Sequence, residues 1–83
     1  MKYTYYALFD TDKDDPTATN VTFPDIFCGV TCGYGEENTM MMAQDLLKSM
    51  LQIAPEQCGA PSSEDKMKAL FPDRKIVRIT VEL

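Results

Sequence analysis

Residues 21–35 constrain the fold of this chain more than any other stretch, because they stop one strand, start another and lead into a helix. Pro24 cannot donate a hydrogen bond to a sheet ladder, and Asp25 favours a turn. A strand that reaches this point must therefore end. The apolar run Val30–Tyr34 predicts a short second strand, and Gly35 supplies the backbone freedom to begin a helix directly after it.

The longest predicted element is a helix from Glu36 to Ile53, which Pro55 ends. The two acidic residues in its first turn, Glu36 and Glu37, are stabilised there by the positive end of the helix dipole. Its apolar residues recur at helical spacing and predict a buried stripe formed by Met40, Ala43, Leu47, Met50, Leu51 and Ala54. Met41 and Met42 lie off this stripe, and they serve either as boundary packing or as an adaptable contact surface for another chain.

Three further runs predict strands, and one predicts a short helix. Tyr3–Phe9 is apolar on both faces, which is typical of a central strand that is covered on two sides. Ala18–Phe23 is the strand that Pro24 stops. Ile76–Leu83 alternates apolar and polar residues, which fits an edge strand with one solvated face. Glu64–Leu70 has a serine in front of it and a proline behind it, so we expect a short helix there.

These elements predict a single α+β domain over residues 1–83, in the order β-β-β-α-β. The first three strands form an antiparallel meander. A right-handed helical crossover would then bring the last strand parallel to the first, so the sheet is expected to be mixed, with spatial order 3-2-1-4. One main helix packs on one face, and the short extra helix precedes the last strand.

Length and composition indicate a small globular protein. A domain of 83 residues buries only about 60% of its unfolded surface, so association with a partner or with itself is a physical expectation. No apolar run approaches the roughly 18 residues that a membrane span needs. The first residues lack the apolar core of a signal peptide, and we expect a cytoplasmic protein.

The sequence predicts no metal and no cofactor. It has three cysteines, Cys28, Cys32 and Cys58, and no histidine, so a zinc site would need a fourth ligand of another kind. Asp10, Asp12 and Asp14 imitate the start of a calcium loop. The loop pattern fails at the position that requires glycine and at the position that requires glutamate, so a hairpin loop is expected instead.

Charge is distributed unevenly along the chain. Residues 1–65 hold three basic and eleven acidic side chains, whereas residues 66–83 hold five basic and two acidic ones. An acidic body repels nucleic-acid phosphates and attracts basic proteins. We therefore expect a basic protein partner, and no direct DNA binding by this chain alone.

Several short motifs occur in the same order as in a known family. They are Tyr5-Tyr6-Ala7, Val21-Thr22-Phe23-Pro24-Asp25, Thr31-Cys32-Gly33, Ala43-Gln44-Asp45-Leu46-Leu47, Ala60-Pro61-Ser62 and the closing run from Val77 to Leu83. With the predicted order of elements, this pattern resembles the HicB-like antitoxins of bacterial toxin–antitoxin pairs, without the C-terminal DNA-binding extension that many of them carry. The resemblance implies a partial ribonuclease H-like domain.

The resemblance also implies a function. HicB-like proteins bind and neutralise a small basic ribonuclease toxin of the HicA kind, and an acidic body suits such a partner. The residues expected to contact it are Phe23, Asp25, Ile26, Phe27, Met41, Met42, Asp12 and Asp14. Phe23 and Ile26 are equally compatible with a core position. Self-association into a dimer or a higher oligomer is expected whether or not the chain binds a toxin.

Two alternatives come from other classes of function. A stand-alone homo-oligomer with a structural or RNA-associated role would need no toxin partner. A nuclease would need several carboxylates that converge on a divalent metal. Asp10 follows the first strand, Asp45 is the one acid inside the helix, and Glu82 falls on the solvated face of the last strand. The sequence therefore favours binding over catalysis.

Overall fold

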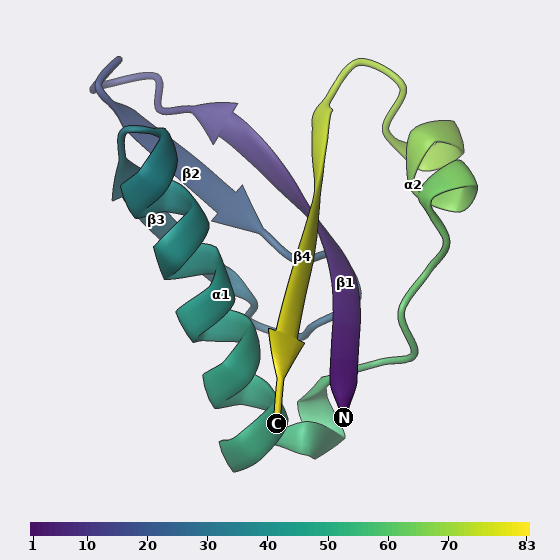
Figure 1. The fold of residues 1–83 in the computed structure, drawn as a ribbon. Coiled ribbons are helices and arrows are strands. Elements are labelled where there is room, and N and C mark those ends of the chain that lie inside the picture. Colours follow the sequence, from purple (N-terminus) through teal and green to yellow (C-terminus); the bar gives the residue numbers. More distant parts are fainter.

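The computed structural model describes all 83 residues as a four-stranded sheet with helices against it. The elements are β1 (Lys2–Thr11), β2 (Ala18–Thr22), β3 (Val30–Tyr34), α1 (Glu36–Ile53), the 3-10 helix η1 (Pro55–Gln57), α2 (Glu64–Leu70) and β4 (Lys75–Glu82) (Figure 1). The α+β class, the order of elements and the bounds of α1 and α2 agree with the sequence predictions. So does the spatial order β3-β2-β1-β4.

The direction of β4 differs from the sequence prediction. Every neighbouring pair of strands is antiparallel, including β1 with β4, so the sheet is not mixed. Tyr3 lies opposite Val81, and Phe9 lies opposite Lys75. The two ends of the chain consequently lie side by side, where the Met1 amino group donates to the Leu83 carbonyl at 2.8 Å (Figure 1).

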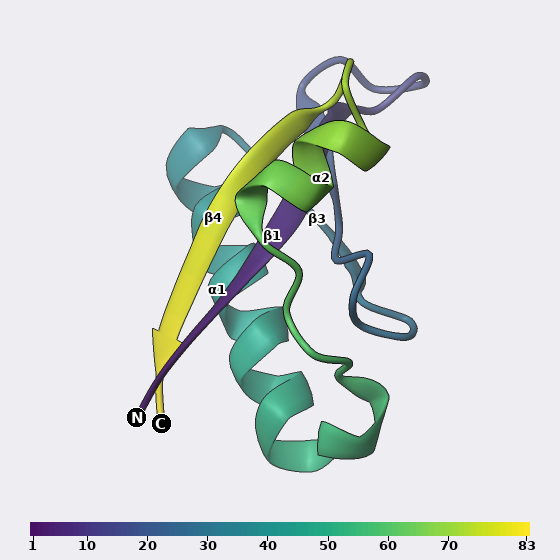
Figure 2. The ribbon, with the colours of Figure 1, turned by 90° about the vertical axis from the view of Figure 1, so that its right-hand side faces the viewer.

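The path of residues 54–74 explains why the parallel arrangement was wrong. After α1 the chain does not enter β4 directly. It passes through η1, then climbs along the sheet to α2, and turns into β4 near the end of β1 (Figures 1 and 2). The connection from β3 to β4 therefore runs along the sheet twice, first as α1 and then back as residues 54–74. As a result, β4 has to run toward the end of the sheet where β1 begins. The sequence around 63–73 is the second half of this crossover.

The main core lies between α1 and one face of the sheet. It contains nine buried residues: Tyr5, Ala7, Val21, Phe23, Ile26, Ala43, Leu47, Ile79 and Val81. Residues two apart along a strand share a face, which is why alternate positions of β1 and β4 supply this cluster. Ala43 and Leu47 are one helical turn apart and are fully buried, so the predicted stripe of α1 is the core stripe.

Part of the opposite face of the sheet is also buried. Leu8 points away from α1 and is nevertheless only 2% exposed. It pairs with Ile76 of β4, and α2 lies on this side of the β1–β4 pair (Figure 2). Met67, the buried residue of α2, is 1% exposed. The short helix thus covers the second face at one end of β1, as the two apolar faces of that strand predict.

Two glycines allow the tight junction between β3 and α1. Gly35 has φ of +81°, a conformation that L side chains rarely adopt. Gly33 lies directly beneath the first turn of α1, where a Cβ atom would come within 2.5 Å of the Thr39 Cα. The side chain of Asn38 accepts the Tyr34 N–H at 2.8 Å and so ties the helix start to the end of the strand.

We predict that Gly33→Ala destabilises the fold, because its added methyl group meets backbone atoms that can yield only if α1 shifts. Overpacking of this kind costs about 1–3 kcal/mol in the free energy of unfolding. Urea unfolding followed by circular dichroism measures this cost. Ser49→Ala, on the exposed side of α1, is the control and should change stability by less than about 0.5 kcal/mol. Equal stabilities of the two variants would contradict the close packing.

Candidate protein-binding surface

The loop between β1 and β2 is organised by Asp12. Its Oδ1 accepts the backbone N–H groups of Asp14 at 2.8 Å and Asp15 at 3.1 Å, and its Oδ2 accepts the Asn20 side chain at 3.0 Å. These bonds favour the charged carboxylate, chiefly the one from Asp14, and they lower the pKa of Asp12 below its ordinary value. Asp12 is therefore a turn-forming residue, whereas Asp14 is exposed to solvent.

An ion pair neutralises the acid nearest to this loop. Arg74 donates from Nε to Asp10 at 2.8 Å, and its Nη2 also contacts the same carboxylate. The hydrogen bond to Asp10 raises the pKa of Arg74. This bidentate pair ties the end of β1 to the segment that leads into β4. Asp10 thus has a cationic partner within the chain, whereas Asp12, Asp14 and Asp15 form no salt bridge.

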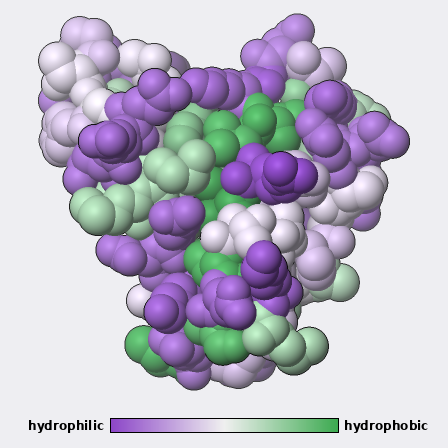
Figure 3. Space-filling view, in the orientation of Figure 1, coloured by the Kyte–Doolittle hydropathy of each residue, from purple (hydrophilic) through white to green (hydrophobic).

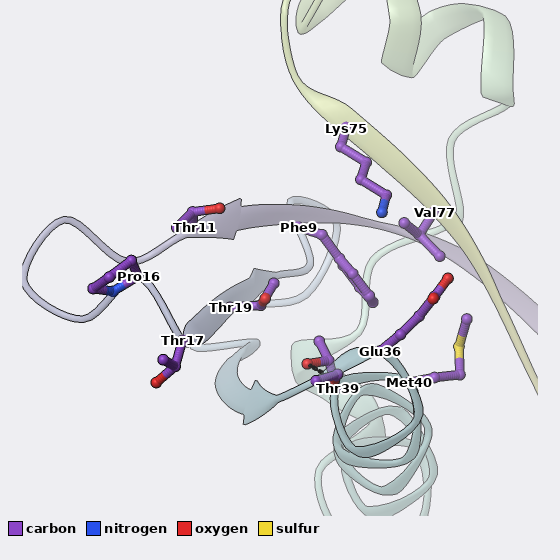
Figure 4. Close-up of a pocket in the computed structure, with 11 residues that line it drawn as sticks. Phe9, Thr11, Pro16, Thr17, Thr19, Glu36, Thr39, Met40, Lys75 and Val77 are labelled. Carbon is purple, nitrogen blue, oxygen red and sulfur yellow. Dashed lines mark hydrogen bonds between the residues drawn. The ribbon is translucent and has the colours of Figure 1, made fainter.

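A cleft of about 480 Å³ lies between this loop and the start of α1 (Figure 4). Glu36 and Met40 enter it from α1, and Lys75 reaches toward it from β4 (Figure 4). Threonine hydroxyls supply much of its polar lining, from Thr11, Thr17, Thr19 and Thr39. Thr39 is already committed, because its Oγ1 donates to the Gly35 carbonyl at 2.6 Å. The cleft offers hydrogen-bond partners and one charge of each sign.

Five acidic residues share this end of the sheet and are called the acidic end here: Asp12, Asp14, Asp15, Glu36 and Glu37. The end of β1, the start of β2 and the end of β3 lie together because the strands form an antiparallel meander. The cleft confirms this proximity, since Pro16 of the loop and Glu36 of the helix both line it. Sequence reasoning identified the loop acids and missed Glu36 and Glu37 as members of the same surface.

The Phe23–Gly29 loop lies at the opposite end of β2 and is fastened to the linker after α1. The Asp25 carboxylate accepts the Ser62 N–H at 2.8 Å and the Ser62 Oγ–H at 2.9 Å. The Asp25 carbonyl accepts the Gly59 N–H at 2.8 Å, and Phe27 donates to the Gln57 carbonyl at 2.9 Å. Asp25 is therefore the centre of an internal latch between two segments that are 37 residues apart.

The linker is also held from the other side. The Tyr5 hydroxyl donates to the Gly59 carbonyl at 2.6 Å, and burial raises the pKa of this hydroxyl. The backbones of Cys58 and Ile26 pair as an isolated antiparallel β-bridge, and burial raises the pKa of the Cys58 thiol. Cys28 and Cys32 are exposed free thiols. No group of three His, Cys, Asp or Glu side chains is arranged to hold a metal ion.

The residues predicted to contact a partner do not form one surface. Phe23 and Ile26 are only 1% and 3% exposed, so they are core residues and have no side-chain surface to offer a partner. Phe27 is 71% exposed and lies at the latch end, far from the acidic end along the sheet. Met41 is 51% exposed on α1, and Met42 is half-buried. Asp12 and Asp14 lie together in the acidic end.

Comparison with known proteins adds no relative to this picture. No protein-family model matches the chain, and neither the curated proteins nor the solved structures give a match. In addition, none of the helices has the length and apolar character needed to cross a membrane.

We predict that Asp25→Ala lowers the free energy of unfolding by about 2 kcal/mol, because hydrogen bonds to a charged acceptor contribute about 1.5–3 kcal/mol each. Ser62→Ala keeps the backbone bond to Asp25 and should cost about half as much. Urea unfolding of both variants measures the difference. Asp14→Ala is the control, since its carboxylate makes no hydrogen bond within the chain. If Asp25→Ala is no less stable than this control, the latch does not stabilise the fold.

The lowered pKa of Asp12 predicts an acid-dependent loss of stability. The carboxylate has a lower pKa in the folded chain than in the unfolded one, so its full contribution is present above about pH 4. That contribution falls as the pH drops further and the folded carboxylate becomes protonated. Asp12→Asn should therefore show a weaker dependence of the melting temperature on pH between about 5 and 2.5 than the unmodified chain. Asp14→Asn is the matched control, and an equal slope for Asp12→Asn and the unmodified chain would refute the assignment.

Proposed function

We propose that this chain is a cytoplasmic protein-binding module of the HicB-like antitoxin type, which binds and neutralises a small basic ribonuclease of the HicA kind without catalysing a reaction itself. The observation that supports this proposal best is the acidic end. It places the acidic β1–β2 loop near the first turn of α1, with Glu36 lining the polar cleft between them, in a chain of net charge −5. Charge complementarity of this kind accelerates encounter and selects partners of the opposite sign.

The cleft suits an inserted basic side chain. Glu36 supplies a carboxylate at its wall, and threonine hydroxyls supply acceptors around it. Lys75 lines the same cleft, so an incoming cation would enter on the side of Glu36 and the loop rather than next to β4. An arginine or lysine of a partner would thereby exchange water for charge-assisted hydrogen bonds.

An apolar contact lies next to the acids on α1. Met41 follows Glu37 by four residues, so the two side chains lie on one side of the helix. Met41 is 51% exposed, and an unbranched thioether adapts to irregular partner surfaces. We therefore place the partner against the acidic end and the outer side of the first turns of α1. Phe27 belongs to the other end of the sheet and would contact only a partner large enough to span it.

The carboxylates that a nuclease would use lie apart. Asp10 is paired with Arg74 at the acidic end. Glu82 is at the far end of β4 and opposite Lys2, and Asp45 is exposed on α1. Metal-dependent nucleases need several carboxylates within reach of one or two ions. This separation favours a role in binding rather than in catalysis.

The motifs that carry the family resemblance occupy structural positions. Phe23 is a core residue, and Asp25 is bonded to Ser62. The Phe-Pro-Asp and Ala-Pro-Ser segments are therefore the two halves of the latch. This contact gives a physical reason for the two motifs to occur together in one chain, and it supports the family proposal independently of charge.

We predict that the tagged chain captures one small basic protein in stoichiometric amount from its native host, and that this protein cleaves RNA when it is freed from the complex. Adding the purified chain back should stop the cleavage. Asp14→Lys and Glu37→Lys should each weaken the complex by about 10-fold, because close charge pairs across an interface contribute about 1.4 kcal/mol or more.

Glu56→Lys is the matched control for these variants. It makes the same change in net charge at the latch end of the molecule, and binding should change by less than about 3-fold. Isothermal titration calorimetry at two salt concentrations measures the affinities, and the differences should shrink at high salt. The proposal fails if the captured protein does not cleave RNA, or if all three variants bind it equally.

A further inference from the structure

The two edges of the sheet differ in the backbone groups that they leave free. On β3, alternate residues point their N–H and C=O groups away from β2, and these are Val30, Cys32 and Tyr34. The Val30 N–H donates to the Cys28 carbonyl at 3.0 Å, and the Tyr34 N–H donates to Asn38 at 2.8 Å. Cys32 therefore has the only free outward N–H group on this edge, and a further strand would find little to pair with.

The edge formed by β4 is longer and free. Leu83 and Met1 exchange backbone hydrogen bonds, which fixes the alternation along the β1–β4 pair. Odd-numbered residues of β4 point toward β1, and the even-numbered residues Arg78, Thr80 and Glu82 point their N–H and C=O groups outward. The close approach of the Thr4 and Thr80 hydroxyls, at 2.9 Å, agrees with this assignment.

No other element covers this edge near the end of the chain. In Figure 2, the half of β4 next to its arrowhead forms the outline of the molecule. On the face shown in Figure 3, hydrophobic residues follow the line that β4 takes in Figure 1, interrupted by hydrophilic ones. An exposed strand edge with free backbone groups and apolar neighbours is a template for pairing with another strand.

We infer that the occupant of this edge is a second copy of the same chain, paired through β4 antiparallel to β4 about a two-fold axis at Thr80. In this register Thr80 faces Thr80 of the second copy, and Arg78 faces Glu82 of the second copy on both sides of the axis. The outward backbone groups of these three residues then form hydrogen-bonded pairs. The two sheets join into one antiparallel sheet of eight strands.

Charge complementarity selects this occupant and this register. Arg78 and Glu82 are separated by four residues, so a two-fold axis midway between them places each opposite the other, and opposite charges across strands are stabilising. An axis at Arg78 would set two arginines against each other. An axis at Ile79 or Val81 would leave both charges without an opposite charge. Lys2 already lies opposite Glu82 on β1, so Glu82 would sit between two cations.

On the face of the sheet toward α1, apolar residues of the two copies also lie opposite each other. Within the same register Ile79 lies opposite Val81 of the second copy, and Val77 lies opposite Leu83. These residues are on the core face, where Ile79 is fully buried and Val81 is 8% exposed. Leu83 is 41% exposed in the single chain. Pairing would extend the apolar face across the axis and remove Leu83 from water.

The test is sedimentation equilibrium of the full chain and of charge variants over a dilution series. The unmodified chain should form a dimer whose dissociation constant rises at least 10-fold in Arg78→Glu and in Glu82→Arg. Each of these variants sets like charges opposite each other twice. The double variant Arg78→Glu/Glu82→Arg restores both opposite-charge pairs and should dimerise within about 3-fold of the unmodified chain. Lys66→Glu is the matched control and should leave the dimer unchanged.

Amide hydrogen exchange of the unmodified chain tests the same interface without any substitution. When the chain is diluted below the dissociation constant, the amides of Arg78, Thr80 and Glu82 should exchange fast while those of Ile79 and Val81 stay protected. Above that concentration all five should be protected, and Cys32 should remain fast. A chain that stays monomeric at millimolar concentration, or a dimer in which the β4 amides stay fast, would overturn the inference.

Discussion

The packing of α1 against one face of the sheet is the contact on which the rest of this structure depends. Three small residues, Ala7, Gly33 and Ala43, let the helix approach the strands closely, and the larger residues around them fill the remaining space. A chain of this length has one main core and little apolar area to spare. The position of α1 also fixes the acidic end, because its first turn begins where β3 ends. The proposed binding surface therefore depends on where α1 begins.

The local elements of the fold could be predicted from the sequence because their signals are local. Gly35 is the N-cap of α1 and Pro55 follows its C-cap, and the alternation of Ile76–Leu83 marks β4 as an edge strand. The direction of β4 depends instead on where the chain travels between residues 54 and 74. A right-handed crossover would make β4 parallel to β1 only if β4 began directly after α1. Residues 54–74 instead return along the sheet before β4 begins, and no periodicity in the sequence records such a path.

The candidate surface was less predictable than the fold, because side-chain roles depend on partners that are distant in sequence. Asp25 is attractive as a contact residue in a turn, but Ser62 occupies its carboxylate. Asp12 belongs to an acidic loop, yet its carboxylate accepts hydrogen bonds from the neighbouring backbone N–H groups. Phe23 and Ile26 flank an exposed turn while pointing into the core. Glu36 and Glu37 were the strongest signal for this surface that the sequence offered. Their place in the first turn of a helix is explained by the helix dipole alone, so they did not stand out as contact residues.

The uneven distribution of charge along the chain reconciles the two surfaces. Five of the eight basic residues fall within residues 66–83, which include β4, whereas the acidic end lies where β1 and β3 finish. From Thr80 to Lys75 the strand rises by about 17 Å, so the acidic ends of two copies paired at Thr80 would be roughly 30 Å apart. The Debye length at physiological salt is about 8 Å, and repulsion between them would be screened. An acidic chain can therefore pair with itself through one edge and still present both acidic ends to basic partners.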